Sequence, residues 1–306
     1  MQKLKVIFAG AGEFGRPTLA AVADAGHHLV QVVSQPDRPA GRGRKLTPTP
    51  IAQFALDRGL PLITTDNINA LSLPAADVMV VIAFGQKISP AVVNHARLGS
   101  VNLHSSRLPR FRGAAPINWA ILAGDKITGN SIIRLAEKMD AGAILAQSEL
   151  TIGESETAGE LHDRLSQDGV PLMLNTLQAL ADGTAIETPQ DHSLATMAPK
   201  LSRESAVIDW TQTPFQIARK INGLSPWPGC RVRLVNPDGA EIAKLTLLRA
   251  KPLNASRPGS GRIVSQTVDG QVEILDVQPE GKRPMTLAAY RNGYPWGDGY
   301  RLESIV

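Results

Sequence analysis

The stretch LKVIFAGAGEFGRPTLAAVADA, residues 4–25, decides the fold of this chain. Its apolar run at residues 4–9 predicts a strand, which passes through a glycine-rich turn into a predicted helix over residues 16–25. A second β-rich run follows at residues 29–34. A strand, a helix and another strand in this order are typical of a parallel sheet.

The same alternation continues through the first half of the chain. Further strands are predicted at residues 62–64, 78–84 and 100–104, and further helices at residues 50–58, 116–123 and 158–182. The strands lack a strict polar alternation, which indicates a sheet covered on both faces. We therefore predict a Rossmann-like α/β domain over residues 1–189.

The pattern changes after Gly183. Residues 190–205 are predicted to form a linker, and residues 206–306 a second domain that begins with a helix over residues 214–223. Short β segments separated by turn-rich stretches follow in this second domain, at residues 231–234, 243–250, 261–264 and 272–277. Short strands at this spacing predict a small antiparallel barrel of the OB-like kind.

The composition narrows the class of protein. The apolar runs are too short to span a bilayer, and a single cysteine, Cys230, cannot form an internal disulfide, so a cytoplasmic protein is expected. Residues 1–189 hold 17 basic and 17 acidic side chains, and residues 190–306 hold 15 and 11, which places the net charge of +4 in the last third. This excess fits either a polyanionic partner or an ordinary solvated surface.

A dinucleotide-binding site is one reading of the first turn. Gly10, Gly12 and Gly15 match the G-x-G-x-x-G pattern between a strand and a helix, and Asp37 follows about twenty residues later. An NAD-dependent dehydrogenase is therefore an alternative. Against it, Asp37 lies within a predicted loop, after the second strand has ended.

The strongest polar constellation lies later in the chain. Asn102 and His104 are two residues apart on a predicted strand, so both project from the same face near its carboxyl end. The amide can donate to an oxyanion and the imidazole can move a proton at neutral pH. Asp140, in a turn before another β-like run, is a candidate to orient the histidine. A pair of hydrogen-bonded residues and a turn aspartate are the structural alternatives.

The surrounding motifs resemble the 10-formyltetrahydrofolate-dependent formyltransferase family. They are Asn102-x-His104, the segment SRLPRFRGAAP at residues 106–116, and Asp140-Ala-Gly142. The resemblance covers essentially the whole chain and is strongest to members that formylate the methionine carried by initiator tRNA. Two departures are an arginine at position 107, where the family usually has leucine, and Gly10-Ala-Gly-Glu-Phe14 in place of Gly-Thr-Pro-Asp/Glu-Phe.

The resemblance implies roles for individual residues. It implies catalysis by Asn102, His104 and Asp140, with 10-formyltetrahydrofolate as the formyl donor and no metal. It implies donor contacts at Ser106, Arg107, Leu108, Pro109, Phe84, Gly85 and Gln86, and tRNA contacts at Arg38, Arg42, Arg44 and Lys45. We expect basic residues of the second domain to bind the tRNA backbone, namely Arg231, Arg233, Lys244, Arg249, Lys282 and Arg283. A monomer is expected, and a formyltransferase acting on an amino-sugar nucleotide is the alternative.

Overall fold

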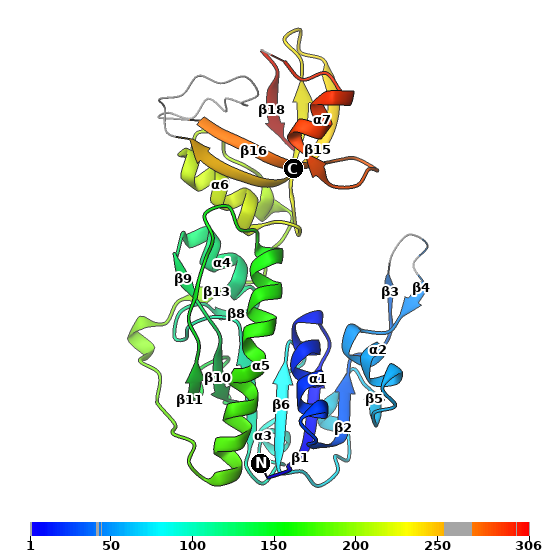
Figure 1. Cartoon of the computed structure of the whole chain (residues 1–306), viewed down its shortest axis with the longest axis vertical. Coiled ribbons are helices and arrows are strands. Elements are labelled where there is room, and N and C mark those ends of the chain that lie inside the picture. Colours follow the sequence, from blue (N-terminus) through cyan, green and yellow to red (C-terminus); the bar gives the residue numbers. More distant parts are fainter. Residues whose placement is uncertain (1, 41–42, 44, 254–270, 298, 306) are drawn as a thin grey trace. The chain divides into compact units, whose positions relative to one another are not determined.

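The computed structural model describes residues 2–40, 43, 45–253, 271–297 and 299–305. The chain divides into two compact units, each made of three segments (Figure 1). We call the first the α/β unit; it consists of Met1–Gly113, Gly129–Leu150 and His162–Met197. We call the second the β unit; it consists of Ala114–Thr128, Thr151–Leu161 and Ala198–Val306.

A seven-stranded sheet in the order β11-β10-β7-β6-β1-β2-β5 forms the centre of the α/β unit. Its strands are β1 (Lys5–Gly10), β2 (His28–Ser34), β5 (Leu62–Thr64), β6 (Val78–Ile82), β7 (Ser100–His104), β10 (Ser131–Arg134) and β11 (Ile144–Gln147). The first five are parallel, whereas β10 runs antiparallel to β7 and β11 antiparallel to β10. The predicted parallel sheet is thus confirmed, with two antiparallel strands added at one edge.

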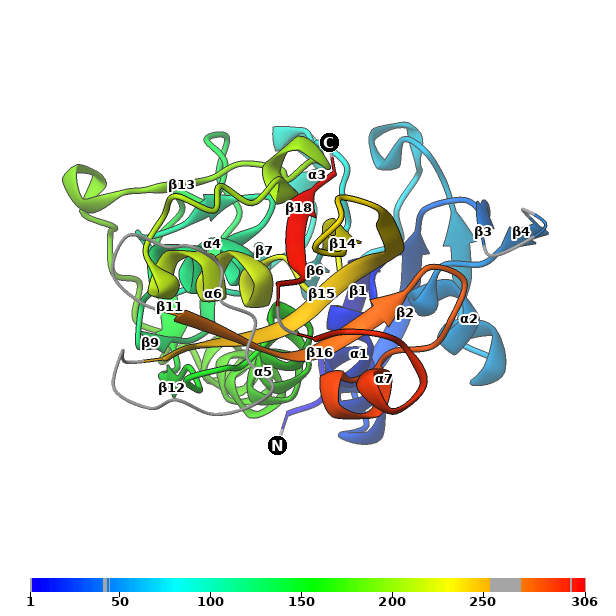
Figure 2. The same ribbon diagram turned by 90° about the horizontal axis from the view of Figure 1, so that it is seen from above.

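Helices cover both faces of this sheet. Figure 2 shows α1 and α5 on one side of the central strands and α3 on the other. On the α5 face the side chain of Leu103 lies 2.6 Å from where a Cβ on Gly169 would stand, so the helix can approach β7 closely only because this position is glycine. The helices of this unit are α1 (Arg16–Asp24), α2 (Pro50–Asp57), α3 (Pro90–Val93) and α5 (Ala158–Asp182), the last from residue 162 onward, with 3-10 turns η1 (Glu13–Gly15), η2 (Ile68–Ala70) and η3 (His192–Leu194).

The order of the strands creates a switch point. The chain proceeds from β1 outward to β2 and β5, then returns to place β6 on the other side of β1. Connections from β1 and β6 therefore leave in opposite directions at their carboxyl ends, and ligands of open α/β sheets bind at such points. The first glycine turn and the loop after Ile82 flank this point, and β7 ends one strand further along.

The β unit is built on a five-stranded antiparallel sheet in the order β17-β16-β15-β14-β18. Its elements are α4 (Pro116–Ala123), β9 (Ile127–Thr128), η4 (Glu204–Ala206), α6 (Pro214–Gly223), β14 (Cys230–Val235), β15 (Glu241–Leu253), β16 (Gln271–Pro279), β17 (Met285–Thr286), α7 (Leu287–Gly293) and β18 (Arg301–Ser304). The predicted second, antiparallel β domain is confirmed. Among the described residues β17 and β18 are the two edges, and the strand predicted at residues 261–264 lies outside them.

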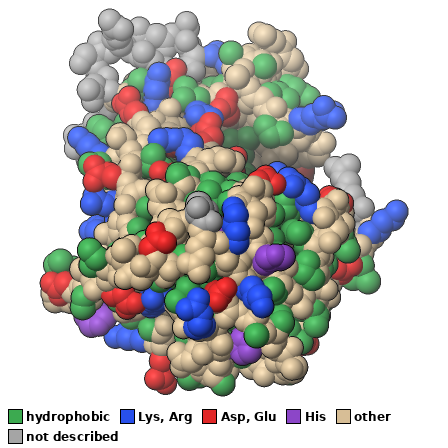
Figure 3. Space-filling model, turned by 60° about the horizontal axis from the view of Figure 1, so that its bottom comes forward, with side chains coloured by type: hydrophobic (Ala, Val, Ile, Leu, Met, Phe, Trp, Pro, Cys, Tyr) green, Lys and Arg blue, Asp and Glu red, His purple; other side chains and the backbone are tan. Residues whose placement is uncertain are grey.

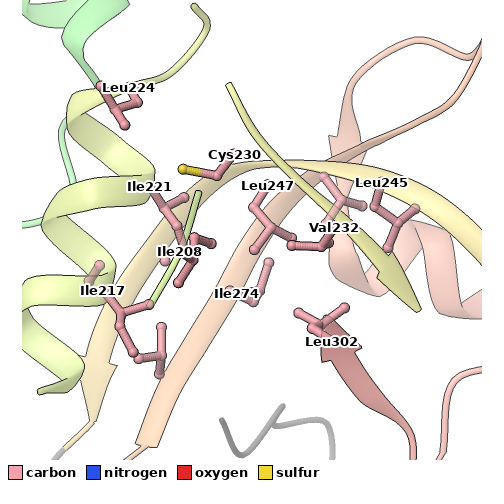
Figure 4. Close-up of a cluster of buried hydrophobic side chains, with 14 of the residues drawn as sticks. Ile208, Ile217, Ile221, Leu224, Cys230, Val232, Leu245, Leu247, Ile274 and Leu302 are labelled. Carbon is pink, nitrogen blue, oxygen red and sulfur yellow. The ribbon is translucent and has the colours of Figure 1, made fainter. Parts of the chain in front are cut away.

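The core of the β unit lies between α6 and the sheet. Figure 4 shows Ile217 and Ile221 of the helix directed toward the strands that carry Val232, Leu247 and Ile274. Burial of such side chains stabilises the fold by about 1.5–3 kcal/mol each. The helix begins at a capping box, in which Thr213 and Gln216 each bond the other's backbone nitrogen.

The units differ from the contiguous division expected from the sequence. Residues 114–128 and 151–161 group with the β unit, although they precede the expected boundary at residue 189. The expected linker, residues 190–205, includes the buried residues Gln190 and Ala198. The strand β10, the short pair β3 (Arg38–Ala40) and β4 (Lys45–Thr47), the helix α7 and the strand β18 were not anticipated, since each is short. The remaining short strands are β8 (Arg112–Gly113), β12 (Leu150–Thr151) and β13 (Met197–Ala198).

Candidate active site

The candidate site lies at the carboxyl end of β7. Asn102 is in register with Val81 of β6 and with Ile133 of β10, and His104 is in register with Ser131. Parallel neighbours in register share a face, so Asn102 lies on the face of Val81, opposite the face that Leu103 presents to α5. The two residues predicted to share a face therefore do so, at the edge where the switch point lies.

Both ring nitrogens of His104 face oxygen atoms. Nε2 lies 2.9 Å from the backbone oxygen of Phe111, and Nδ1 lies 3.6 Å from Oδ2 of Asp140. Because a carbonyl oxygen only accepts, Nε2 carries a hydrogen in this arrangement. The distance to Asp140 exceeds a hydrogen bond but suits an ion pair with a doubly protonated ring. The ring is 7% exposed, so it is held within the protein.

The Asp140 carboxylate is fixed by the backbone as well as by the histidine. Its Oδ2 accepts a hydrogen bond of 2.8 Å from the backbone nitrogen of Gly113. Asp140 has a φ of 51°, in the left-handed region that a residue with a side chain enters at a cost of about 1–3 kcal/mol. Such a conformation persists where the surroundings hold it. The structure thus brings together His104 and Asp140, which are 36 positions apart in the sequence, a contact that the sequence left open.

The segment Phe111–Gly113, which ends with β8, was not predicted to be part of the site. Phe111 supplies the carbonyl that faces His104, and Gly113 supplies the amide that faces Asp140. Phe111 has a φ of 60°, and its backbone nitrogen donates to Oγ1 of Thr196 at 2.9 Å. These are backbone contacts, which residue types do not encode directly.

The Asn102 side chain differs from its neighbours. It is half-buried, and its amide makes no hydrogen bond to any other residue that the structure describes. An amide that is held on a strand and still has both hydrogens free can donate to a substrate oxygen. Of the three predicted catalytic residues, Asn102 is therefore the one with free hydrogen-bonding capacity.

The segment predicted to contact the donor, Ser106–Pro109, is largely internal. The Ser106 hydroxyl donates to the Arg110 carbonyl at 2.7 Å, and the Ser106 carbonyl accepts from the hydroxyl of Ser131 at 2.6 Å. Leu108 is buried, and its carbonyl accepts from Gln147 Nε2 at 2.9 Å. The Leu108–Pro109 peptide bond is cis. These contacts hold the segment to β10 and β11.

Arg107 is the exposed member of that segment. Its guanidinium lies 2.8 Å from Oε2 of Glu149, and both side chains are about half exposed. The arginine that stands where the family usually has leucine is therefore matched by an acidic neighbour. An exposed pair of this kind contributes about 0–1 kcal/mol and can exchange partners.

The loop after β6 holds the other predicted donor contacts. Phe84 is buried in the core, while Gly85 is exposed and has a φ of 75°. The side chain of Gln86 accepts from the nitrogen of Ile68 at 2.8 Å and donates to the oxygen of Thr65 at 2.6 Å. Phe84 and Gln86 thus shape the loop, and the exposed backbone at Gly85 is the part open to a ligand.

The predicted tRNA loop begins with a short hairpin, β3 and β4. Arg38 and Lys45 are both exposed on it, whereas Arg42 and Arg44 lie outside the described residues. Gln35 connects this hairpin to the preceding loop: its Nε2 donates to the oxygen of Phe84 at 2.5 Å and its Oε1 accepts from Arg38 at 2.6 Å. Gln35 carried no signal in the sequence.

The glycine turn packs against β6. A Cβ on Gly10 would stand 2.9 Å from the oxygen of Ile82, and one on Gly15 would stand 3.2 Å from the Ile82 side chain. Gly12, in contrast, has no close neighbour. The turn also contains the 3-10 turn η1 before α1 begins. Packing against β6 is therefore sufficient to explain glycine at positions 10 and 15.

Four of the six basic residues of the β unit that were predicted to bind the tRNA backbone form ion pairs. Arg233 lies 2.6 Å from Glu303, Arg231 lies 3.6 Å from Glu280, and Lys244 lies 4.0 Å from Glu241. Arg249 bonds both Asp276 and Glu160. The side chains of Lys282 and Arg283 are exposed and form no ion pair with other described residues. Basic and acidic side chains are likewise interspersed on the side drawn in Figure 3.

Two kinds of feature are absent from the residues that the structure describes. No group of three or more His, Cys, Asp and Glu side chains there is arranged to hold a metal ion. No helix there has the length and apolar character needed to cross a membrane.

Comparison with known families covers both units. Residues 2–177 match the model of formyl transferase, and residues 200–295 match that of the formyl transferase C-terminal domain. The chain belongs to the formyl transferase family. The first matched region contains the three predicted catalytic residues, and the second contains four strands of the five-stranded sheet, β14 to β17.

Relatives within the formyl transferase family extend over the whole chain. The methionyl-tRNA formyltransferase of Moorella thermoacetica is 38% identical, with 99% of this chain and 100% of the relative covered. That of Phenylobacterium zucineum is also 38% identical, with 98% and 100% covered.

Solved structures share the fold at lower identity. An N-formyltransferase from Helicobacter canadensis in complex with folinic acid and dTDP-3-aminofucose is 17% identical, with a TM-score of 0.64 and 85% and 92% of the two chains covered. HypX from Aquifex aeolicus in complex with tetrahydrofolic acid is 17% identical, with a TM-score of 0.63 and 94% and 47% covered.

Proposed function

We propose that this protein transfers the formyl group of 10-formyltetrahydrofolate to the α-amino group of methionine on initiator tRNA, in the cytoplasm and as a monomer. The observation that carries the proposal is the agreement over the full length with methionyl-tRNA formyltransferases, including the C-terminal domain. The geometry at Asn102, His104 and Asp140 supports it, since these groups suit acyl transfer to an amine.

The protein has to stabilise the tetrahedral intermediate more than it has to activate the attacking amine. The α-amino group of a chain terminus has a pKa of about 7.7–8.0, so part of it is neutral and nucleophilic near pH 7. Its nitrogen attacks the formyl carbon and gives a tetrahedral intermediate with an oxyanion and a positive amine. The bond from carbon to N10 of folate then breaks, and the proton lost by the amine is balanced by one gained at N10.

The three residues divide these tasks. Asn102, whose amide is unoccupied among the described residues, donates to the oxyanion; loss of such a donor costs about 2.7–4 kcal/mol. His104 and Asp140 form the pair that accepts and passes the proton, because the Nδ1 side of the ring faces a carboxylate at 3.6 Å. The Phe111 carbonyl keeps the ring in that orientation.

Substrate binding falls to the surrounding loops. Donor contacts are assigned to the segment Ser106, Arg107, Leu108 and Pro109 and to the loop Phe84, Gly85 and Gln86, with the exposed Gly85 and Arg107 as the members open to the ligand. Acceptor contacts are assigned to Arg38, Arg42, Arg44 and Lys45, with Arg42 sensing the acceptor end, and to exposed basic residues of the β unit.

The test offers 10-formyltetrahydrofolate to the purified protein with three acceptors: methionine-charged initiator tRNA, free methionine and an amino-sugar nucleotide. We expect formyl transfer to the charged tRNA alone. Transfer to the sugar nucleotide, or no transfer to charged tRNA, would overturn the proposal.

The division of labour has its own test. Arg42→Ala is expected to raise the KM for charged tRNA while the affinity for the folate donor stays near that of the wild type. Equal losses for both substrates would contradict the assignment of Arg42 to the acceptor.

A further inference from the structure

The Gln190 side chain donates two hydrogen bonds to the backbone of the turn that carries Asp140. It is 7% exposed, and its Nε2 donates to the backbone oxygens of Asp140 at 2.8 Å and of Gly142 at 2.7 Å. Its Oε1 accepts from Arg112 Nε at 3.1 Å and Nη2 at 2.5 Å. A reversed amide would turn its hydrogens toward the guanidinium, so these partners fix its orientation.

Arg112 lies behind Gln190 and is 3% exposed. Besides Gln190, its side chain bonds Nδ1 of His192 at 2.9 Å, and no carboxylate is among its partners in the described residues. Along the chain it stands between Phe111 and Gly113, the residues whose backbone contacts His104 and Asp140. A buried guanidinium is costly unless its donors are satisfied, so Arg112 and Gln190 constrain each other.

These contacts close a ring around the reacting pair. The ring runs from His104 to the Phe111 carbonyl, along β8 to Arg112, through Gln190 to the Asp140 backbone, and back to His104 across 3.6 Å. Two members of the ring, Phe111 and Asp140, have a left-handed backbone, with φ of 60° and 51°. Gln190 bonds the carbonyls on both sides of Ala141 and so holds the turn that carries the carboxylate.

We propose that Gln190, held by Arg112, is a positioning residue for formyl transfer, which sets the Asp140 carboxylate against His104. The inference rests on the proposed function for its kinetic part. A shift of about 1 Å in a reacting group can cost on the order of 100-fold in rate. Loss of Gln190 should therefore lower kcat, while the binding of donor and acceptor, which uses other loops, is retained.

Gln190→Glu separates this role from a purely structural one. The glutamate keeps a partner for Arg112 but has no hydrogen to donate, and its oxygens repel the carbonyls of Asp140 and Gly142. We expect kcat to fall by about 10- to 100-fold, with the KM of each substrate within about 3-fold of wild type. Gln190→Met removes both links and should lower kcat at least as far. Ser100→Ala is the matched control, because it removes a buried donor to the Val93 carbonyl at the opposite end of β7.

A second readout does not depend on the acceptor. In protein labelled at its six histidines, the NMR signal of His104 is assigned by its loss in His104→Gln and followed against pH. We expect Gln190→Met, which adds no charge, to move the His104 titration in the same direction as Asp140→Asn, and Ser100→Ala to leave it unchanged.

The outcomes are distinct. An unchanged His104 titration in Gln190→Met overturns the positioning role, whether or not kcat falls, and so does a kcat of Gln190→Glu within about 2-fold of wild type. If the wild-type protein fails to formylate charged tRNA, the proposed function fails, while the His104 titration still decides the role of Gln190.

Discussion

The candidate active site and the outer face of the five-stranded sheet use polar side chains in opposite ways. At the site, His104, Arg112 and Gln190 are buried, and their partners include the backbone oxygens of Phe111, Asp140 and Gly142. On the sheet, Arg231 and Arg233 are half exposed and pair with other side chains. Loss of one partner costs about 1–3 kcal/mol or more for a buried polar group and about 0–1 kcal/mol for an exposed pair.

This difference fits two kinds of task. A network that is costly to break keeps its geometry, which a reaction at a formyl carbon needs. Pairs that open at little cost can exchange a carboxylate for a phosphate, which binding to a polyanion needs. The predictions below test whether the two regions divide chemistry and binding in this manner.

The largest effect is expected at Asn102. Asn102→Ala removes the amide proposed to meet the oxyanion, so kcat should fall by about 100- to 1,000-fold, with both KM values within about 3-fold. The measurement is steady-state formylation of charged tRNA. Asn94→Ala, an exposed asparagine that caps α3 in the same unit, should have no effect. A change in KM without a change in kcat would assign Asn102 to binding.

The next effect separates charge from backbone strain at Asp140. Asp140→Asn keeps the side chain and tolerates the φ of 51°, yet loses the charge, so kcat should fall by about 100-fold at little cost in stability. Asp140→Gly should be about 1 kcal/mol more stable than Asp140→Ala, because glycine accepts a positive φ. Urea unfolding and kinetics of the three variants measure both effects. Equal stability of the Gly and Ala variants would show that the turn is not strained.

Much of the fold around Asn102 and His104 could be predicted from the sequence. The period of two on a strand placed Asn102 and His104 on one face, and apolar runs placed β1, β6 and β7 within one or two residues of their observed bounds. The boundaries of α4, α5 and α6 were predicted as observed, because Pro116 and Pro214 open two of these helices and apolar periodicity runs through the third.

The ring around Asp140 could not be predicted in the same way. Phe111 and Gly113 act through backbone atoms, and Gln190 meets Arg112 across 78 positions. Neither kind of contact leaves a local pattern. Likewise, the acidic partners of Arg231 and Arg233, Glu280 and Glu303, come from later strands and turns.

A smaller effect is expected in the turn between β16 and β17. Lys282 and Arg283 lack ion-pair partners among the described residues, so they are available to phosphates. Lys282→Ala with Arg283→Ala should raise the KM for charged tRNA several-fold and reduce the salt slope of binding by about 2, with kcat unchanged. Arg233→Ala should change the slope by less than 1, since Arg233 is already paired with Glu303. A fall in kcat in the double variant would break the division between the two regions.

The smallest effect concerns an ion pair inside the β unit and depends on pH. Although partial burial opposes it, hydrogen bonds from Arg249 and Thr157 lower the pKa of Glu160. A lowered folded-state pKa contributes stability above the unfolded value of about 4.3, and this is lost as the pH falls through the folded pKa. Glu160→Gln keeps the capping box with Thr157 but loses the charge. It should therefore lower the free energy of unfolding by about 0.5 kcal/mol at pH 7 and by almost nothing below pH of about 4.

Cys230 offers a local readout for this change. Burial raises the pKa of its thiol to about 12, so it should react with a thiol reagent only when the core of the β unit opens. Its rate of labelling in urea, compared between wild type and Glu160→Gln at the two pH values, measures the effect in the unit to which both residues belong. Glu280→Gln, which loses only the 3.6 Å contact with Arg231, is the control and should change the rate less. If the difference in labelling rate between wild type and Glu160→Gln grew as the pH fell, the direction of the Glu160 pKa shift would be contradicted. The view that Arg249 is held by Glu160 and Asp276, and is not available to phosphate, would fail with it.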